Sequence, residues 1–298
     1  MMNAKSAVLP IVCTALAALY FLHPLIQAAR KNTLPVKSAI INPAEKNDIV
    51  QIALEAADGS KITIVKAKNL WTGHIDGLDA VFPCVTAQVD SFIDELTAIK
   101  KTYPVPRASG ETVFSENGAD FVMSWTLSGG KTKSVHIGGR DFSETMRFIQ
   151  AENGAVSKIE SGFDNYLDTS TRFWCDPYII PRLWSGGSAA AENIQRISFI
   201  ADGKRIVLKA GANGFMPRFE RLATLRHGEL VGSLPPPAEN PVLRIDAEFS
   251  NGEFISIPVY RVDDGAYLLH YDLRGGTLQY GALISGQTFL KILECKKE

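Results

Sequence analysis

The sequence is poor in cysteine, with four in 298 residues, and one of these, Cys13, lies in an apolar run near the N-terminus. The other three, Cys84, Cys175 and Cys295, form no Cys-x-x-Cys pair. A zinc ribbon needs closely spaced cysteine pairs and a disulfide-built fold needs several bridges, so both classes are excluded. Two interpretations stay open: three ordinary thiols, or a single Cys84–Cys175 disulfide in an oxidising compartment.

An excess of charge of one sign is also missing, because 31 basic residues face 32 acidic ones. A nucleic-acid-binding domain needs a basic patch or stripe, and none is visible in the sequence. The five histidines include no His-Glu-x-x-His motif and no pair at positions i and i+4. We therefore expect no nucleic-acid partner, no metal site and no cofactor.

Motifs of covalent catalysis are absent as well. Ser128 and Lys131 have the Ser-x-x-Lys spacing of penicillin-binding enzymes, but they flank a Gly-Gly turn and no Lys-Thr-Gly follows. The tripeptide Gly130-Lys131-Thr132 matches the end of a phosphate-binding loop, yet Trp125 stands where its first glycine should be. We predict no catalytic residues and a protein that is not an enzyme.

What the sequence does contain is a long apolar run at residues 6–29, without a charged residue. As a helix it would extend roughly 36 Å, enough for a hydrocarbon core of about 30 Å. A cleaved signal peptide would end in a small-x-small site, which the run lacks, so retention as a transmembrane anchor is favoured. More positive charges follow the run (Arg30, Lys31 and Lys37) than precede it (Lys5), and this charge excess by itself would leave the short N-terminus outside. Because an anchor after so short a tail usually exports the larger body, we expect a single-pass membrane protein with an extracytoplasmic (periplasmic) C-terminal body.

The body contains an internal repeat. After a polar linker at residues 30–47, ADGSKITIVKA at 57–67 returns as ADGKRIVLKA at 201–210. The Asp-Gly pair in each copy supplies the positive φ angles of a tight hairpin turn. Further hairpin turns are expected, in the same order after each copy, at four places: Gly129-Gly130, Asn153-Gly154, Asn251-Gly252 and Asp264-Gly265.

An amphipathic helix is expected after each copy of the first hairpin. The first, within residues 85–101, has its last turn at Lys100 and Lys101 and carries its apolar residues on one face: Val89, Phe92, Ile93, Leu96 and Ile99. The second, at residues 217–228, begins at Pro217, ends at a Gly228 cap and has the apolar stripe Phe219, Leu222 and Leu225.

These patterns predict a β-rich α+β fold of two tandem repeats behind the transmembrane helix. Each repeat is expected to consist of antiparallel hairpins supported by one helix. The first is placed at residues 48–184 and the second at residues 192–295.

Three runs of the sequence carry a family resemblance: SFIDELTAIKKTYP, SVHIGGRDFSETMRFIQAENGAVSKI and FWCDPYIIP. In these runs the chain resembles domain-of-unknown-function family 4340, whose members are bacterial proteins with one membrane span and a duplicated, strand-rich body. The resemblance implies an envelope protein associated with an ABC-type transport or gliding-type complex, and it supplies no catalytic residues.

The connection FWCDPYIIPRLW between the repeats is unusually aromatic. We expect it to contact a protein partner through four candidate residues: Phe173, Trp174, Tyr178 and Trp184. The predicted function is that of an anchored accessory or interaction protein in the cell envelope. The alternative is an envelope hydrolase, or a lipid- or glycan-binding module, whose site is assembled only in three dimensions. A pocket with grouped carboxylates or a Ser-His pair would favour that alternative.

Overall fold

The computed structural model describes residues 35–68, 70–106, 114, 118–182, 193–232, 240–250, 252–263, 265–273 and 277–296. The anchor predicted at residues 6–29 lies outside these ranges, as does Trp184. Along the described parts of the chain, no helix combines the length and apolar character needed to cross a bilayer.

Strands dominate the body, as predicted. They are β1 (Val36–Ser38), β2 (Ile49–Ala56), β3 (Lys61–Ala67), β4 (Leu70–Ile75), β5 (Leu78–Pro83), β6 (Lys100–Pro104), β7 (Phe121–Leu127), β8 (Thr132–Arg140), β9 (Met146–Ala151), β10 (Val156–Glu160), β11 (Ile194–Ala201), β12 (Lys204–Lys209), β13 (Leu230–Gly232), β14 (Leu243–Phe249), β15 (Phe254–Arg261), β16 (Ala266–Leu273) and β17 (Leu278–Ser285). The helical segments are η1 (Pro43–Asp48), α2 (Thr86–Thr97), η2 (Asp164–Tyr166), α4 (Thr171–Trp174), α5 (Phe215–Ala223) and α6 (Gly286–Lys296).

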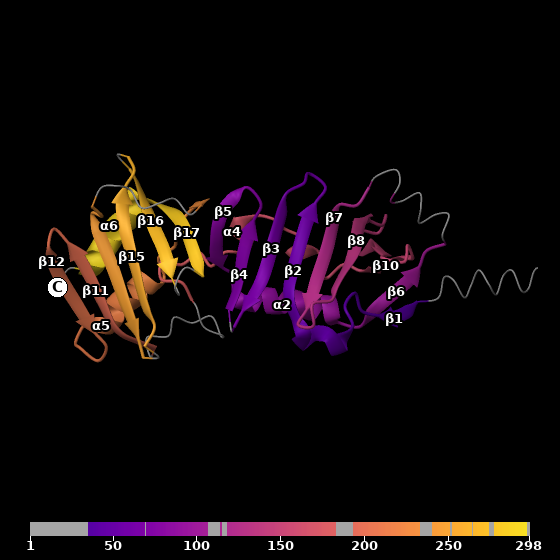
Figure 1. The fold of residues 1–298 in the computed structure, drawn as a ribbon, viewed down its shortest axis with the longest axis horizontal. Coiled ribbons are helices and arrows are strands. Elements are labelled where there is room, and N and C mark those ends of the chain that lie inside the picture. The colour runs from indigo at the N-terminus through magenta and orange to yellow at the C-terminus, as the bar shows by residue number, and fades with distance from the viewer. Residues whose placement is uncertain are drawn as a thin grey trace, which may run out of the picture.

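All of these strands belong to one antiparallel sheet that runs the length of the molecule (Figure 1). Their order in space is β1-β6-β10-β9-β8-β7-β2-β3-β4-β5-β17-β16-β15-β14-β11-β12, and β13 lies beside β17. We call β1 to β10 the N-terminal half and β11 to β17 the C-terminal half. The β-rich, antiparallel class is thereby confirmed.

Glycine supplies a positive φ angle in most of the predicted hairpin turns. Gly265, between β15 and β16, does not, and Asp264 beside it lies outside the described residues. The β2–β3, β7–β8 and β9–β10 turns contain Gly59 (φ 83°), Gly130 (φ 79°) and Gly154 (φ 78°). In the C-terminal half, Gly252 (φ 82°) lies between β14 and β15. These positions match the predicted turns, because the requirement for a left-handed backbone is local and readable in the sequence.

The first helix is shorter than predicted. Val89, Phe92, Ile93 and Leu96 of α2 are buried, as expected. The helix nevertheless ends at Thr97, Ile99 is 67% exposed, and the two lysines after it begin β6. Ala98 adopts an extended conformation, and β6 then pairs with both β1 and β10, so sheet pairing replaces the last helical turn.

The second helix is displaced from its predicted position. It spans Phe215–Ala223, begins after Gly214 (φ 79°) and holds Pro217 in its first turn. Gly228 is not its cap: the Gly228 backbone N–H donates to Leu283 O at 2.7 Å, in the chain leading to β13. The predicted stripe ends at Leu222, while Leu225 packs on the core from beyond the helix.

Part of the predicted linker belongs to the folded body. β1 pairs with β6, and Ile41 is fully buried with its N–H donating to Leu96 O. The β1 strand therefore starts at the outer edge of the N-terminal half, far from β12 at the other end of the sheet (Figure 1).

The two halves meet at a narrow seam. β5 and β17 are paired at one register position, Val81 with Gln279, while β13 covers the next part of the β17 edge. Close backbone approach requires glycine here, because a Cβ on Gly281 would lie 2.9 Å from Gly232 O. Helix α6 follows β17 and packs against α5. The two helices together cover the sheet of the C-terminal half.

Candidate functional site at the seam

Residues 171–182, which we call the connector segment, join the two halves. On one side, Cys175 forms an isolated antiparallel bridge with Cys84 at the end of β5. On the other, Tyr178 forms a second bridge with Arg226 after α5. The segment therefore hydrogen-bonds to both halves and reinforces the short β5–β17 contact.

The aromatic residues of the connector segment divide into buried and half-buried ones. Trp174 is fully buried, its Nε1–H donates to Asp168 O, and its ring centroid lies 5.7 Å from that of Phe92. It anchors the segment in the core, so its side chain does not reach a partner-contact surface. Phe173 and Tyr178 are half-buried and keep part of their surface in solvent.

Two arginines lie close to the ring of Tyr178. The Arg182 guanidinium is 3.6 Å from the ring centroid and that of Arg226 is 5.2 Å away. The Arg226 Nη2 group also approaches the Tyr178 hydroxyl at 3.4 Å. The positive charges and the aromatic ring attract each other, so this part of the connector segment is a cationic, partly exposed surface.

The two seam cysteines are buried free thiols, with exposed fractions of 1% for Cys84 and 5% for Cys175. Burial raises the pKa of the Cys84 thiol, and the nearby Asp176 charge raises it further. Burial also raises the pKa of Cys175, with added contributions from Cys84 and Asp176. Since the thiolate is the nucleophile, these thiols are poorly suited to covalent catalysis in the folded protein.

Asp176 is a buried carboxyl group inside the connector segment, with 3% of its surface exposed. Its side chain accepts hydrogen bonds from the backbone N–H groups of Tyr178 and Arg182. Burial raises the pKa of Asp176, although these two hydrogen bonds and the charges of Arg182 and His227 act in the lowering direction. The carboxyl therefore shapes the turn at Pro177 at an electrostatic cost.

His227 lies beside Asp176, but both of its ring nitrogens face backbone carbonyls. Nδ1 is 3.0 Å from Gly228 O and Nε2 is 3.0 Å from Asp176 O. Neither nitrogen is directed at a thiol or hydroxyl, so the arrangement does not form a nucleophile–base pair. His227 instead holds the connector segment against the chain that leads to β13.

Two stacked tyrosines close the seam from the C-terminal half. The rings of Tyr271 and Tyr280 are both fully buried, with centroids 4.2 Å apart. The Tyr271 hydroxyl donates to Ile179 O at 2.9 Å, whereas the Tyr280 hydroxyl has no hydrogen-bond partner among the described residues.

Two hollows adjoin this buried cluster. The larger, of about 570 Å³, contains Cys175, and its lining also includes Arg172, Arg226, His227 and Glu229. The smaller, of about 240 Å³, contains Cys84 and Asp176 and is lined in addition by Thr86, Tyr178 and Arg182. The described lining of the larger hollow contains no Ser-His pair and no group of carboxylates.

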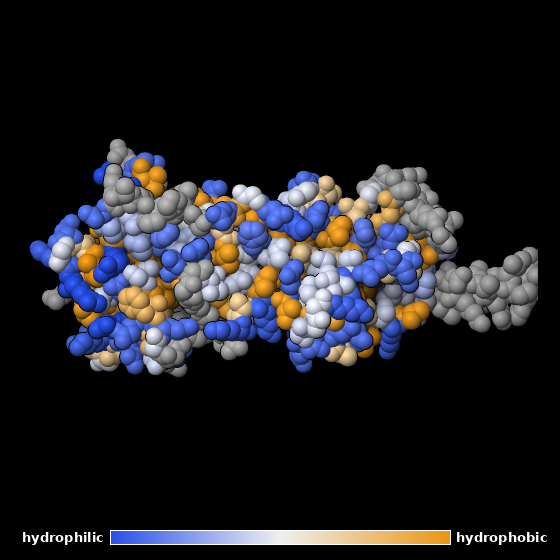
Figure 2. All heavy atoms as spheres, viewed as in Figure 1, coloured by the Kyte–Doolittle hydropathy of each residue, from blue (hydrophilic) through white to orange (hydrophobic). Residues whose placement is uncertain are grey.

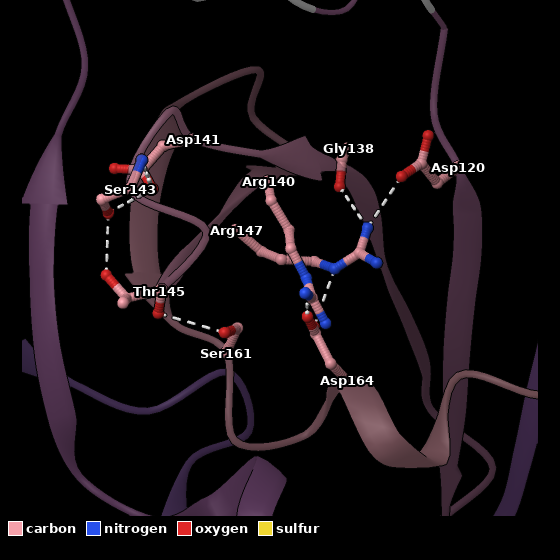
Figure 3. A network of polar contacts seen from close by, with 9 residues as sticks. All are labelled: Asp120, Gly138, Arg140, Asp141, Ser143, Thr145, Arg147, Ser161 and Asp164. Carbon is pink, nitrogen blue, oxygen red and sulfur yellow. Dashed lines mark hydrogen bonds and ion pairs between the residues drawn. The ribbon is translucent and has the colours of Figure 1, made fainter.

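A second polar network lies in the N-terminal half, in the SVHIGGRDFSETMRF run (Figure 3). Asp164 accepts hydrogen bonds from Arg147 Nε and Arg140 Nε, both at 2.7 Å. The Arg147 Nη1 group also donates to Asp120 and to Gly138 O. The network connects Asp120, just before β7, with β8, β9 and η2. Nothing in the sequence indicates this network, because its partners are distant along the chain.

The other histidines and cysteines do not cluster into a metal site: the described residues contain no group of three or more His, Cys, Asp or Glu side chains that could hold a metal ion. His74 Nδ1 faces Ala80 O, and burial lowers the pKa of His270. Cys295 lies in α6, away from the seam, and its thiol donates to Lys291 O.

Comparisons with known proteins returned no significant match: no protein-family model, no curated protein and no solved structure.

Proposed function

We propose that this chain is a membrane-anchored, extracytoplasmic accessory protein that binds a protein partner in the cell envelope. The apolar run at residues 6–29 supports the anchor. The resemblance to family 4340 supports the envelope setting and an association with an ABC-type transport or gliding-type complex. The narrow seam and the absence of an activated nucleophile among the described residues fit a binding role better than a hydrolytic one.

The observation that carries the proposal is the sheet edge at β12. Among the described strands, β12 pairs only with β11, so its other edge is open. It is at the opposite end of the sheet from β1, the first described strand after the proposed anchor (Figure 1). At about 4.8 Å per strand, the sheet holds this edge roughly 70 Å from β1.

The chemistry of the β12 edge specifies the kind of partner. Lys204, Arg205 and Lys209 lie along the strand, and Figure 2 shows hydrophilic side chains over this end of the molecule. An open edge offers backbone hydrogen bonds to an added strand, and the basic side chains favour an acidic one. We infer that the partner supplies an acidic, extended segment.

The proposed tandem repeat is supported by matching strand orders. The N-terminal half contains β3-β2-β7-β8-β9-β10-β6, and the C-terminal half contains β12-β11-β14-β15-β16-β17-β13. In each, a helix precedes the short strand that pairs with the last strand of the half. The hairpin β4–β5 of the N-terminal half has no counterpart beside β12 among the described strands. We propose that this hairpin was added to a duplicated unit and joins the two halves.

Two experiments test the proposed function. The first is protease treatment of intact spheroplasts: digestion of the body down to a membrane-held stub is expected, and full protection would refute the extracytoplasmic location.

The second experiment places a photo-crosslinking residue at Val207, which is 40% exposed on β12, with a matched probe at Val65, 37% exposed on the interior strand β3. Partner adducts at position 207 and none at position 65 are expected. Equal yields would refute the edge assignment.

A second candidate function, a binding module, is favoured by the larger hollow at the seam. Its volume of about 570 Å³ falls within the range of about 300–1,000 Å³ typical of small-molecule sites. Arg172 and Arg226 favour a ligand with an anionic group, such as a lipid headgroup. A short-chain phospholipid with an anionic headgroup should raise the melting temperature of the wild type but not of Arg172→Ala, with Arg221→Ala on the exposed side of α5 as the control.

A further inference from the structure

Cys84 and Cys175 are directly opposite each other in an antiparallel pairing. The backbone hydrogen bonds identify its type: Val85 N–H donates to Trp174 O at 3.0 Å, and Asp176 N–H donates to Pro83 O at 2.8 Å. The bonds join the residues on either side of the cysteines and not the cysteines themselves. This is the pattern of a non-hydrogen-bonded pair, in which the two Cα atoms approach to about 4.5 Å and the side chains lie on the same face.

That geometry is compatible with a disulfide. Disulfide-bonded cysteines have Cα atoms about 4.4–6.8 Å apart, which includes the separation in a non-hydrogen-bonded pair. Both cysteines are buried at the seam, and Cys84 Sγ would lie 3.0 Å from a Cβ placed on Gly73. The glycine thus leaves room for the sulfur on the adjacent strand β4.

We propose that Cys84 and Cys175 are a disulfide site, closed by thiol–disulfide exchange as the chain folds in an oxidising compartment. A cysteine thiolate attacks the disulfide of a dithiol oxidoreductase and forms a mixed disulfide, and the second cysteine then displaces the enzyme. The chain loses two electrons and two protons, and the oxidoreductase leaves as a dithiol. Only the compartment in this proposal rests on the proposed function; the bond geometry does not.

The thiol–disulfide exchange is expected to occur during folding, before the native structure is complete. In the folded state both thiols are almost completely buried, and burial keeps them protonated. Before the seam closes they are solvated and reactive. The bond would tie β5 to the connector segment, which also pairs with Arg226 of the C-terminal half, so it would fasten the seam covalently on its N-terminal side.

The test uses the full-length chain, purified in detergent, reduced and unfolded. It is refolded either in a mixture of oxidised and reduced glutathione or in dithiothreitol, then unfolded with an alkylating reagent, digested and analysed by mass spectrometry. We expect a cross-linked peptide joining Cys84 and Cys175 only in the glutathione sample, with Cys295 alkylated in both. Cys295→Ser should leave the cross-link unchanged, and Cys175→Ser should abolish it. Complete alkylation of Cys84 and Cys175 after oxidative refolding of the wild type would overturn the proposal.

A second measurement separates this inference from the proposed location. Thiols are trapped with acid in intact cells, and the same peptides are analysed. A cross-linked peptide from cells supports both the site and the oxidising compartment. A bond that forms on refolding but is missing in cells would leave the geometry standing and overturn the compartment.

Discussion

Arg147 Nε donates to Asp164 Oδ1 at 2.7 Å, and only 5% of the Asp164 side chain is exposed. Removing the guanidinium would leave a buried carboxylate with Arg140 as its remaining partner. Loss of one member of a buried ion pair typically costs about 3–5 kcal/mol, so we expect Arg147→Ala to lower the free energy of unfolding by about 3 kcal/mol. Urea denaturation measures it.

The control for this prediction is Arg140→Ala. Arg140 pairs with the same buried Asp164, but its own side chain is 46% exposed, so water can replace its guanidinium, and we expect a loss of about 1 kcal/mol, near the upper end for exposed ion pairs. A loss in Arg140→Ala as large as that in Arg147→Ala would show that burial of the pair does not decide its contribution.

The stacked tyrosines Tyr271 and Tyr280 offer a matched pair of variants. Both are fully buried, but only the Tyr271 hydroxyl has a hydrogen-bond acceptor among the described residues, Ile179 O. Tyr271→Phe should cost about 1–3 kcal/mol, because it leaves a buried carbonyl without a donor. Tyr280→Phe should be neutral or stabilising, because it removes an unsatisfied buried hydroxyl. Equal destabilisation of the two variants would contradict this account of the seam.

Gly73 on β4 is opposite Phe82 on β5, and a Cβ at this position would lie 2.4 Å from Phe82 Cε2. Phe82 is fully buried and cannot swing into solvent, so Gly73→Ala should destabilise the protein by about 1–3 kcal/mol. Gly129→Ala is the control, since a Cβ there meets nothing within 4 Å, and it should change stability by no more than about 0.5 kcal/mol. Thermal unfolding would distinguish the two, and a neutral Gly73→Ala would show that the seam can relax.

Asp176 makes the pH dependence of stability predictable in sign. Burial raises its pKa above the ordinary value in the folded state, so its contribution to stability is fully present at low pH. That contribution is lost as the pH rises through the folded pKa, when a charge must be accommodated in the core. Asp176→Asn should therefore gain stability relative to the wild type as the pH increases from about 4, measured by urea denaturation at a series of pH values.

Asp141 provides the opposite case. The Ser143 hydroxyl donates to its carboxylate and, with the Lys158 charge, lowers the pKa of Asp141. A lowered pKa contributes stability that is present at neutral pH and lost as the pH falls. Asp141→Asn should thus lose stability relative to the wild type as the pH increases. The same slope in Asp141→Asn and Asp176→Asn would rule out this assignment of causes.

Structural features set by a single residue could be predicted from the sequence, whereas features set by contacts between residues far apart in the sequence could not. The turns at Gly59, Gly130 and Gly154 were predictable because a positive φ angle is a demand of one residue. The end of α2 could not be predicted, because the residue pattern through Ile99, Lys100 and Lys101 is still typical of a helix. Pairing of β6 with β1 and β10, which lie far away in the sequence, decided it.

The same reasoning applies to the seam. The aromatic density of the connector segment marks it as unusual in the sequence. Nothing in the sequence indicates, however, that Trp174 is buried or that two arginines lie close to the ring of Tyr178. Asp176 precedes a proline and has the local pattern of a surface turn, and nothing nearby in the sequence indicates its burial. His227 reaches it from fifty-one residues away.

The narrow contact between β5 and β17 has a mechanical consequence. In the proposed arrangement the anchor holds one end of the sheet and the partner holds the β12 edge, so tension between them acts across the strands and tends to peel neighbours apart. Every other junction along the line is secured over several residue pairs, whereas this one has a single pair, Val81 with Gln279, reinforced by β13 and the connector segment. Under load the molecule would part here first, leaving each half with its own sheet and helices intact.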